Sequence, residues 1–283
     1  MSQSSSAVKK IPQGADRAAA KKQLRDSARA MVPGLRARAD EATKLHHLPA
    51  QNVQEMIDAG FFKILQPARW GGLELDPMDF FDVQMTVAEG CMSTAWVLGV
   101  VACHNWQLAL FDDRAQKDVW GEDDNTLISS SYMPVGKVTH VDGGYRLSGR
   151  WNFSSGSKHC KWVMLGGVVP PKAAGEEPDY RTFLVPISDY RIVDNWDVSG
   201  LEGTGSHDIV VEDAFVPQEF AQVPADVRDG RRVGRAEIDE EDSAFGHAGI
   251  DPENPGEVKR AGRGWIGERT RPTKRSHPGI TFR

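Results

Sequence analysis

The sequence predicts an α+β protein in which a helical N-terminal domain is followed by a β-domain. Three observations support this prediction. Apolar residues recur at helical spacing up to about residue 124, short β-favouring runs separated by turn signals follow, and both patterns end near residue 221. A chain of 283 residues is long enough for about two domains. We therefore expect a helical domain over residues 15–124 and a β-domain over residues 125–221.

The composition narrows the class of function. A net charge of −6 argues against a general nucleic-acid binder. The three cysteines, Cys91, Cys103 and Cys160, stand far apart without a C-x-x-C pair, so the sequence indicates neither a disulfide framework nor a metal site. No signal peptide is recognisable over Met1–Gln13, and no stretch approaches the roughly 20 apolar residues of a membrane span. We expect a soluble, cytoplasmic protein with no nucleic-acid or membrane partner.

The helical region opens after a lead-in, residues 1–14, that we expect to be disordered. Ala15–Met31 is rich in Ala, Lys and Arg and favours a helix, which Pro33 is expected to end. Another helix is predicted with Pro49 at its first position. A further helix is predicted to begin at Asp76-Pro77, where the aspartate is the cap and the proline the first residue.

The next helix, from Ser93 to Leu110, is apolar nearly all round and is therefore expected to be buried on most sides. Its polar residues, His104, Asn105 and Gln107, then need hydrogen-bond partners. His104 is the candidate catalytic residue, because an imidazole titrates near neutral pH and could deprotonate a hydroxyl group. The alternative is a core histidine whose hydrogen bonds are satisfied within the fold.

The β-region carries clustered hydroxyl and aromatic side chains. Ser129–Ser131 and Ser154-Ser155 offer hydroxyl donors at strand ends, which suits the edge of a heterocycle, although serine-rich strand ends are also ordinary. Trp151, Phe153 and Trp162 could flank a flat ring or could be core residues. No G-x-S-x-G motif accompanies the serines, which argues against a serine hydrolase.

The glycines of Gly200–Gly205 do not have the G-x-G-x-x-G spacing, and strands are predicted on both sides of them. We interpret this segment as a turn connection between strands.

Several motifs occur together in one order along the chain. They are Phe61-Phe62, Leu65-Gln66-Pro67, Trp70-Gly71-Gly72, His104–Phe111, Trp120–Asp123, Ile128–Tyr132, Gly149–Gly156, Gly203–Ser206 and Val216-Pro217. From about Asp40 to Pro217 the chain resembles the two-component flavin-dependent monooxygenases built on the acyl-CoA dehydrogenase fold. Within that family it is most similar to the oxygenase components that hydroxylate a phenolic secosteroid in steroid degradation, and more distantly to 4-hydroxyphenylacetate hydroxylases.

The resemblance implies an acyl-CoA dehydrogenase-like N-terminal helical domain, a central antiparallel β-barrel domain, and a C-terminal helical bundle that completes the flavin pocket and forms a homotetramer. The last part of this chain does not match that bundle. Residues 222–283 are rich in Arg and Gly, show no helical or alternating apolar pattern, and resemble no part of the family. We expect a disordered tail there, in place of the bundle, as after a frameshift or an early truncation.

The resemblance also implies roles for individual residues. His104 would bind the substrate phenol and help to deprotonate it, and Ser130 would lie near the substrate and the flavin. Ser155 would hydrogen-bond the N5 region of the flavin, and Trp151 and Phe153 would line its ring. Ser131 would be a further cofactor contact.

The function that the resemblance implies is hydroxylation of a phenol ortho to its hydroxyl group, with a secosteroid as one candidate substrate. A separate flavin reductase would supply reduced flavin, FMN or FAD, and O2 would convert it to a C4a-hydroperoxide. One alternative is an acyl-CoA dehydrogenase-like flavoprotein, and another is an inactive truncated fragment. The motif His104-Asn105-Trp106 favours the hydroxylase.

Overall fold

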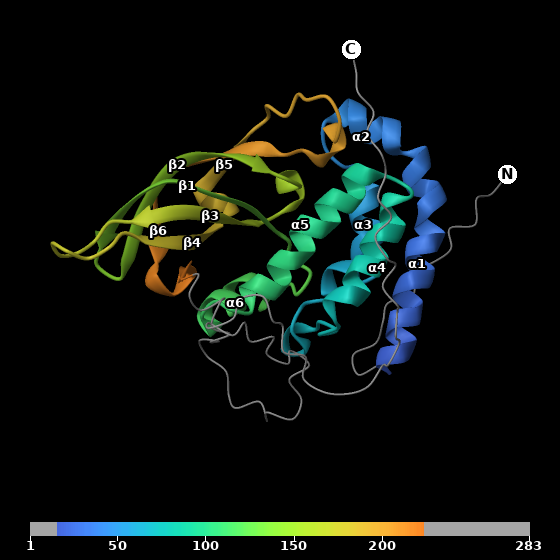
Figure 1. Cartoon of the computed structure of the whole chain (residues 1–283), viewed down its shortest axis with the longest axis horizontal. Coiled ribbons are helices and arrows are strands. Elements are labelled where there is room, and N and C mark those ends of the chain that lie inside the picture. Colours follow the sequence, from blue (N-terminus) through green and yellow to red (C-terminus); the bar gives the residue numbers. More distant parts are fainter. Residues whose placement is uncertain (1–15, 224–283) are drawn as a thin grey trace, which may run out of the picture. The chain divides into compact units, whose positions relative to one another are not determined.

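The computed structural model describes residues 16–223, and helices precede strands along the chain (Figure 1). This order confirms the predicted α+β class. The described residues belong to one compact unit, so the predicted domain boundary near residue 125 stays a prediction. The predicted disordered lead-in, and the predicted tail from residue 224 onward, lie outside the described residues.

The helices fall between residues 17 and 120. They are α1 (Arg17–Ala37), α2 (Ala39–Leu45), α3 (Ala50–Asp58), α4 (Pro77–Ala88), α5 (Met92–Leu108) and α6 (Asp113–Trp120). Short 3-10 turns η1 (Phe61–Lys63) and η2 (Ala68–Trp70) lie between α3 and α4. As predicted, Asp76 caps α4, because its carboxylate accepts a hydrogen bond of 2.8 Å from the Met78 amide.

Helix α1 corrects one detail of the sequence analysis, because it continues through Pro33 and ends only at Ala37. Proline removes one backbone donor and usually breaks a helix interior. Here the last turn is held by tertiary contacts. Leu35 is fully buried, and the Arg36 guanidinium donates a 2.7 Å hydrogen bond to the Glu89 carbonyl just beyond α4. Local propensity is overridden by packing between α1 and α4.

Helix α5 contacts both the other helices and the sheet (Figure 1). It packs against α4 and η1 on the helical side and against the first strand on the other. His104 and Asn105 are buried, and the Asn105 amide donates to the Phe62 carbonyl at 2.7 Å. The prediction that His104 and Asn105 are buried and have hydrogen-bond partners is confirmed.

The strands form one seven-stranded sheet in the order β5-β6-β2-β1-β3-β4-β7. Their bounds are β1 (Ile128–Val141), β2 (Gly144–Ser154), β3 (Trp162–Val169), β4 (Asp179–Pro186), β5 (Tyr190–Val193), β6 (His207–Pro217) and β7 (Ala221–Gln222). Gln222, predicted to begin the tail, therefore lies in a strand and pairs with Thr182 of β4.

This sheet has the predicted place in the fold but differs from the expected antiparallel β-barrel in two respects. Its strand order has two ends, and β1 and β3 run parallel. The cause is the path of the chain. β2 returns along β1 as a hairpin, and the following turn η3 (Ser157–His159) carries the chain to the opposite side of β1, where Trp162 pairs with Ile128. All the other strand pairs of the described sheet are antiparallel.

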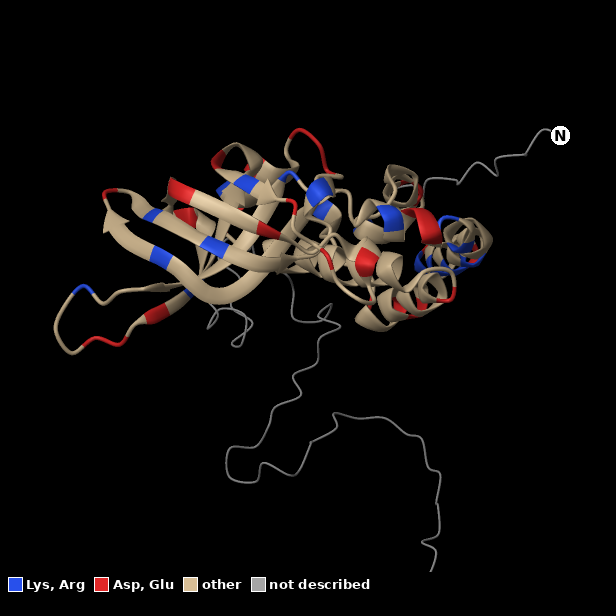
Figure 2. Ribbon diagram, turned by 90° about the horizontal axis from the view of Figure 1, so that it is seen from above, with Lys and Arg blue, Asp and Glu red and all other residues tan. Residues whose placement is uncertain are grey.

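Two apolar clusters stabilise the described residues. One lies within the helices, and the other joins the sheet to α6 and includes Trp151 and Trp120. Basic and acidic residues are interspersed on both the helices and the strands (Figure 2). Among the described residues no helix is long and apolar enough to cross a membrane.

Candidate functional site

Two groups of polar side chains lie against α5, one near its first half and one near its second half. We call the first the hydroxyl chain, which consists of Trp96, Ser155, Thr204 and Ser206. We call the second the imidazole group, which consists of His104, Gln107 and Tyr132. Each group contains one residue that the sequence analysis singled out, Ser155 in the first and His104 in the second.

The hydroxyl chain is a continuous series of hydrogen bonds. The Trp96 indole donates to Ser155 Oγ at 3.1 Å, and Ser155 Oγ lies 2.7 Å from Ser206 Oγ. Ser206 Oγ lies 2.8 Å from Thr204 Oγ1, which in turn donates to the Leu201 carbonyl at 2.9 Å. The three hydroxyl-bearing residues are buried, whereas Trp96 is exposed over 47% of its surface. The chain therefore begins at the surface and ends inside the protein.

The backbone around Gly156 holds Ser155 in this position. Gly156 has φ +70°, and a Cβ there would lie 2.8 Å from Val97 Cγ1. Its amide donates to the Thr204 carbonyl at 2.9 Å. Only glycine fits so close to α5 in this left-handed conformation. The end of β2, helix α5 and the turn η5 (Glu202–Thr204) are thereby brought together at Ser155.

The imidazole group is organised around a buried histidine. His104 is 1% exposed, and its Nδ1 lies 2.7 Å from the Ile128 carbonyl. A carbonyl oxygen only accepts hydrogen bonds, so Nδ1 carries the proton and Nε2 carries the lone pair. Burial in an apolar setting lowers the pKa of His104 to about 4. The imidazole is therefore neutral at pH 7, with Nε2 as an acceptor.

Tyr132 and Ser130 lie beside this histidine. The Tyr132 ring meets the His104 ring edge-on, with centroids 6.1 Å apart, and its hydroxyl donates to the Gln107 side chain. Ser130 lies two residues before Tyr132 on β1, and side chains at this spacing share one face of a strand. Gln107 donates in turn to Gln222 of β7 at 3.1 Å. Of the predicted catalytic pair, the structure thus places Ser130 next to the group that contains His104.

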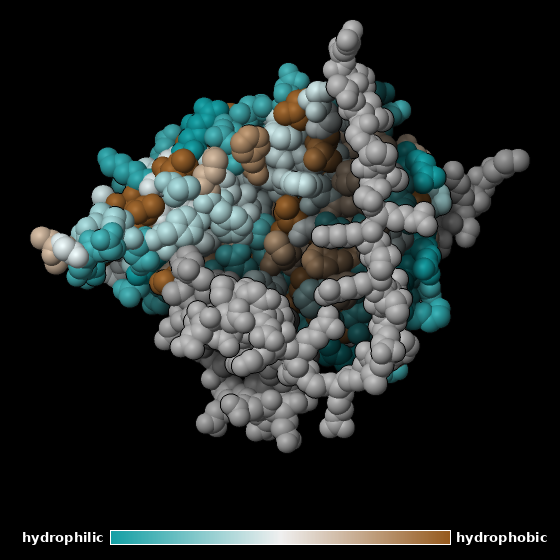
Figure 3. Space-filling model, in the orientation of Figure 1, coloured by the Kyte–Doolittle hydropathy of each residue, from teal (hydrophilic) through white to brown (hydrophobic). Residues whose placement is uncertain are grey.

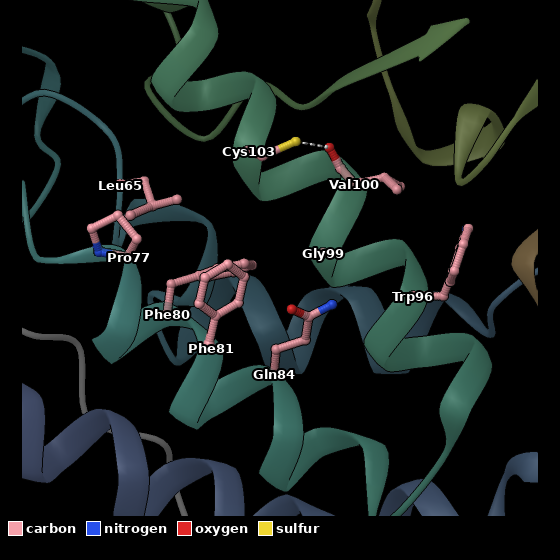
Figure 4. Close-up of a pocket in the computed structure, with 9 residues that line it drawn as sticks. All are labelled: Leu65, Pro77, Phe80, Phe81, Gln84, Trp96, Gly99, Val100 and Cys103. Atoms are coloured by element: carbon pink, nitrogen blue, oxygen red, sulfur yellow. Dashed lines mark hydrogen bonds between the residues drawn. The ribbon is translucent and has the colours of Figure 1, made fainter. Parts of the chain in front are cut away.

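An apolar groove runs between α4 and α5. Figure 4 shows Trp96, Gly99 and Val100 on one side and Phe80, Phe81 and Gln84 on the other. The groove has a volume of about 260 Å³. Cys103 also lines it, and its thiol donates to the Val100 carbonyl. Hydrophobic patches are visible over part of this region in Figure 3. Trp96 is common to this groove and to the hydroxyl chain.

Two residues predicted to contact the cofactor make hydrogen bonds within the fold. Trp151 is fully buried in the sheet core and donates to the Gly166 carbonyl at 2.8 Å, so it cannot line a ligand ring in this structure. We correct its assignment to a structural role. Ser131 donates its hydroxyl proton to the Asn152 carbonyl at 2.7 Å and so links β1 to β2. Its oxygen can still accept a hydrogen bond, and its contact with the cofactor stays a prediction.

Phe153 keeps the accessibility that a ring-lining residue requires. It is 64% exposed and meets Trp196 edge-on, with ring centroids 6.0 Å apart. Its φ of +64° is unusual for a bulky residue and turns the chain before Ser155. Trp162, the other aromatic considered for a flat ring, packs partly buried against the sheet core.

The sequence analysis did not identify Trp96, Thr204 or Ser206 as site residues. Thr204 and Ser206 lie in or beside the segment that we interpreted as a turn connection, and Trp96 lies in a helix interpreted as core. A local pattern could not have joined these residues to Ser155, because Ser206 and Trp96 are 51 and 59 positions away from it. The described residues contain no group of three or more His, Cys, Asp or Glu placed to hold a metal ion.

Comparison with known proteins identifies relatives of this chain. Residues 18–123 match the family "Acyl-CoA dehydrogenase, N-terminal domain". The chain is 50% identical over 188 residues to the flavin-dependent monooxygenase oxygenase subunit HsaA of Mycobacterium tuberculosis, a match that covers 66% of this chain and 47% of HsaA. It is 36% identical over 199 residues to the oxygenase component of an FADH2-dependent resorcinol hydroxylase of Rhizobium sp., covering 70% of this chain and 48% of that protein.

Solved structures agree with these sequence matches. The crystal structure of HsaA from M. tuberculosis superposes with a TM-score of 0.72 at 44% identity, over 75% of this chain and 58% of that one. The structure of XiaF from Streptomyces sp. in complex with FADH2 and glycerol gives a TM-score of 0.68 at 27% identity, over 73% of this chain and 52% of XiaF. The chain spans about half the length of the curated relatives it matches.

Proposed function

We propose that this chain, a homologue of the oxygenase components of two-component flavin-dependent monooxygenases with the acyl-CoA dehydrogenase-like fold, contributes a flavin and phenol site to such an enzyme. The reaction would be hydroxylation of a phenol ortho to its hydroxyl group. The observation that carries the proposal is that His104 of α5 and Ser155, which is hydrogen-bonded to Trp96 of the same helix, each present a neutral acceptor. The sequence resemblance gave both residues roles in this reaction.

The residues around Ser155 fit the edge of an isoalloxazine ring. Ser155 Oγ is held from two sides, by Trp96 and Ser206, and retains one lone pair for a ligand. Phe153 supplies an exposed aromatic face two residues away. When bound, reduced flavin supplies the activation of O2, and the surrounding residues orient it and exclude water. Either FMN or FAD fits this edge, because both carry the same ring.

His104 would act on the phenol as a hydrogen-bond acceptor. With Nδ1 committed to the Ile128 carbonyl, Nε2 is the nitrogen that can receive the phenol proton. The expectation of a base poised near pH 7 does not fit the described environment, because burial lowers the pKa of His104 to about 4. We propose that His104 takes the proton only as the phenolate forms beside it, since the two opposite charges then stabilise each other.

The alternative of an acyl-CoA dehydrogenase-like reaction has less support. Such a reaction needs a carboxylate base, and among the described residues the hydrogen-bond partners of His104 and of the hydroxyl chain include no carboxylate. The two relatives described above are named as a monooxygenase and a hydroxylase.

The proposal extends to partners. The names of the relatives as oxygenase subunits and components support a separate reductase that delivers reduced flavin. A phenolic secosteroid as substrate, and assembly into a homotetramer, are taken from the resemblance. The cytoplasmic location expected from the sequence stays a prediction.

The test is flavin binding by the full 283-residue chain. Under anaerobic conditions, titration with reduced FMN and reduced FAD should give saturable binding, and Ser155→Ala should weaken it by about tenfold, the loss of roughly one hydrogen bond. Ser188→Ala, at an exposed serine of the turn η4 (Ile187–Asp189), is the matched control and should bind like the wild type. If neither reduced flavin binds saturably, the chain has no such site and the proposal fails.

A further inference from the structure

We propose that the outer face of α4 and α5 is an interface at which two copies of this chain pair with each other. The inference does not rest on flavin binding. It is also separate from the homotetramer taken from the resemblance, because that assembly depends on a C-terminal bundle that residues 222–283 do not match.

Every exposed side chain of these two helices is hydrophobic. In α4 the exposed residues are Met78, Phe81 and Met85, and in α5 they are Met92, Trp96, Cys103 and Trp106. We call these seven residues the helical seam. A helix that faces water normally exposes polar side chains, as α1 does with Lys22, Asp26 and Arg29. The helical seam therefore has the composition of a buried surface.

The spacing of the helical seam indicates what covers it. Its members on α4 are three and four residues apart, and those on α5 fall in steps of four, three, four and three once Gly99 is included. This alternation places side chains in one line along a helix and is the pattern of helices that pack lengthwise against other helices. Helix α4 also buries Phe80, Val83 and Val87, so it is apolar on two sides. A helix with that pattern is surrounded by protein.

The groove between α4 and α5 lies within the helical seam and can receive side chains from a second molecule (Figure 4). Gly99 lets the Gln84 side chain lie against α5, because a Cβ at Gly99 would be 2.2 Å from Gln84 Nε2. The same Nε2 donates to the Ala95 carbonyl at 3.1 Å, so it keeps a partner when the groove is filled. An apolar side chain can thus enter without leaving this donor unpaired.

A second copy of this chain is the partner that fits the helical seam. The seam stays exposed with all the described helices in place, and the sequence of residues 1–15 and 224–283 shows no helical apolar pattern. Within these 283 residues no further helix is therefore expected that could cover it. A two-fold axis across the seam would bring α4 and α5 of one copy against α4 and α5 of the other. Such an isologous contact is closed, so assembly stops at two copies.

The exposed area is sufficient for a stable pair. The six large side chains of the helical seam are between 37% and 64% exposed. With roughly 200 Å² for each such side chain, about half of it exposed, one copy offers about 600 Å² and two copies about 1,200 Å². This area is at the lower end of the range for specific protein pairs, so we expect a dissociation constant in the micromolar range.

The experiment is sedimentation velocity on the full chain at concentrations from about 1 to about 100 μM, which bracket this affinity. We expect a discrete species of about 62 kDa, twice the 31.2 kDa of one chain, that dissociates on dilution. Phe81→Glu and Met85→Glu each place a charge in the helical seam and should weaken the pairing by at least about tenfold. Phe215→Glu on β6 is the matched control, since Phe215 is 43% and Phe81 48% exposed, and it should pair like the wild type.

Glutamate favours helices, so both α4 variants should keep the fold, which far-UV circular dichroism checks. The inference is overturned by a wild type that is a monomer at every concentration or forms species larger than a dimer, or by a dimer that neither α4 variant weakens. Equal weakening by Phe215→Glu would overturn it as well. The flavin titration is a separate measurement, so failure of the pairing leaves the proposed function standing, and failure of flavin binding leaves the pairing standing.

Discussion

A neutral hydrogen-bond acceptor lies beside the first half of α5 and another lies on its second half, but the two reach that state by different physical means. Trp96 and His104 are eight residues apart on the helix, about 12 Å along its axis. In the first half, Ser155 is an acceptor because the protons of the neighbouring hydroxyls are all committed. In the second half, His104 is an acceptor because burial disfavours its charged form.

The difference shows which conditions each half tolerates. Hydroxyl groups of serine and threonine do not titrate in the ordinary pH range, so the first half should keep its hydrogen bonds in acid. The acceptor on the second half is a titratable group. Its accepting nitrogen, and the stability that the neutral imidazole contributes, should be lost when His104 takes a proton in acid. Acid is therefore the condition that separates the two halves.

The largest effect is expected at His104. Burial holds its pKa at about 4, below the 6.5 of an unperturbed histidine, so the unfolded chain binds more protons between these values. The stability contributed by neutral His104 is complete above pH 6.5 and declines as the pH falls toward 4. Between pH 7.5 and 4 the loss should be about 3 kcal/mol. The pKa of His159 is also lowered to about 4, so the contribution of His104 is measured as a difference in urea unfolding between the wild type and a His104 variant at these two pH values.

A matched pair of variants isolates this histidine from the others. His104→Asn retains an N–H donor for the Ile128 carbonyl but cannot take a proton, so it should lose less stability in acid than the wild type. His140→Asn, on β1, should lose as much as the wild type. If His104→Asn and the wild type lose the same free energy of unfolding between pH 7.5 and 4, then the second half of α5 is not more sensitive to acid than the first.

A smaller effect, independent of pH, is expected at Ser206. Ser206→Ala removes one donor and one acceptor from a buried chain, which should lower the free energy of unfolding by about 2 kcal/mol. Because no titratable group takes part, the decrease should be the same at pH 7.5 and pH 5. A decrease that grows in acid would show that the hydroxyl chain is coupled to a titrating group, against the comparison drawn here.

The smallest effect is expected at Phe153, where the backbone turns toward Ser155. Its φ of +64° strains any residue with a Cβ, whereas glycine adopts it freely. Phe153→Gly and Phe153→Ala both lose the contact with Trp196, so their difference reports the backbone alone. The glycine variant should be more stable than the alanine variant by about 1 kcal/mol in thermal or urea unfolding. Equal stabilities would show that the turn is not strained.

The sequence was sufficient where a signal was local. The cap Asp76 and the all-round apolar pattern of α5 predicted helices that the structure contains. The resemblance supplied the relatives and the proposed roles of His104 and Ser155. The sheet could be predicted as a set of strands but not in its order, because the parallel pairing of β1 with β3 depends on where the chain crosses after β2.

The parts that could not be predicted depend on tertiary contacts. Pro33 is tolerated in α1 because Leu35 and Arg36 contact the end of α4. Trp151 and Phe153 are two residues apart in one motif, yet one is core and the other is exposed. On a regular strand, side chains two residues apart lie on the same face. The positive φ of Phe153 and the register shift between Trp151 and Ser154 break this regularity, and neither could be read from the local pattern.

The strand order also bears on where another chain could pair with the sheet through its backbone. The two edges of the described sheet are its shortest strands, β5 with four residues and β7 with two. Either strand alone offers few unpaired backbone groups to an added strand. Their neighbours are longer, since β7 pairs with only two of the eight residues of β4, and β5 pairs with only four of the eleven residues of β6. The backbone groups left for a further strand are therefore concentrated on the parts of β4 and β6 that no other described strand covers.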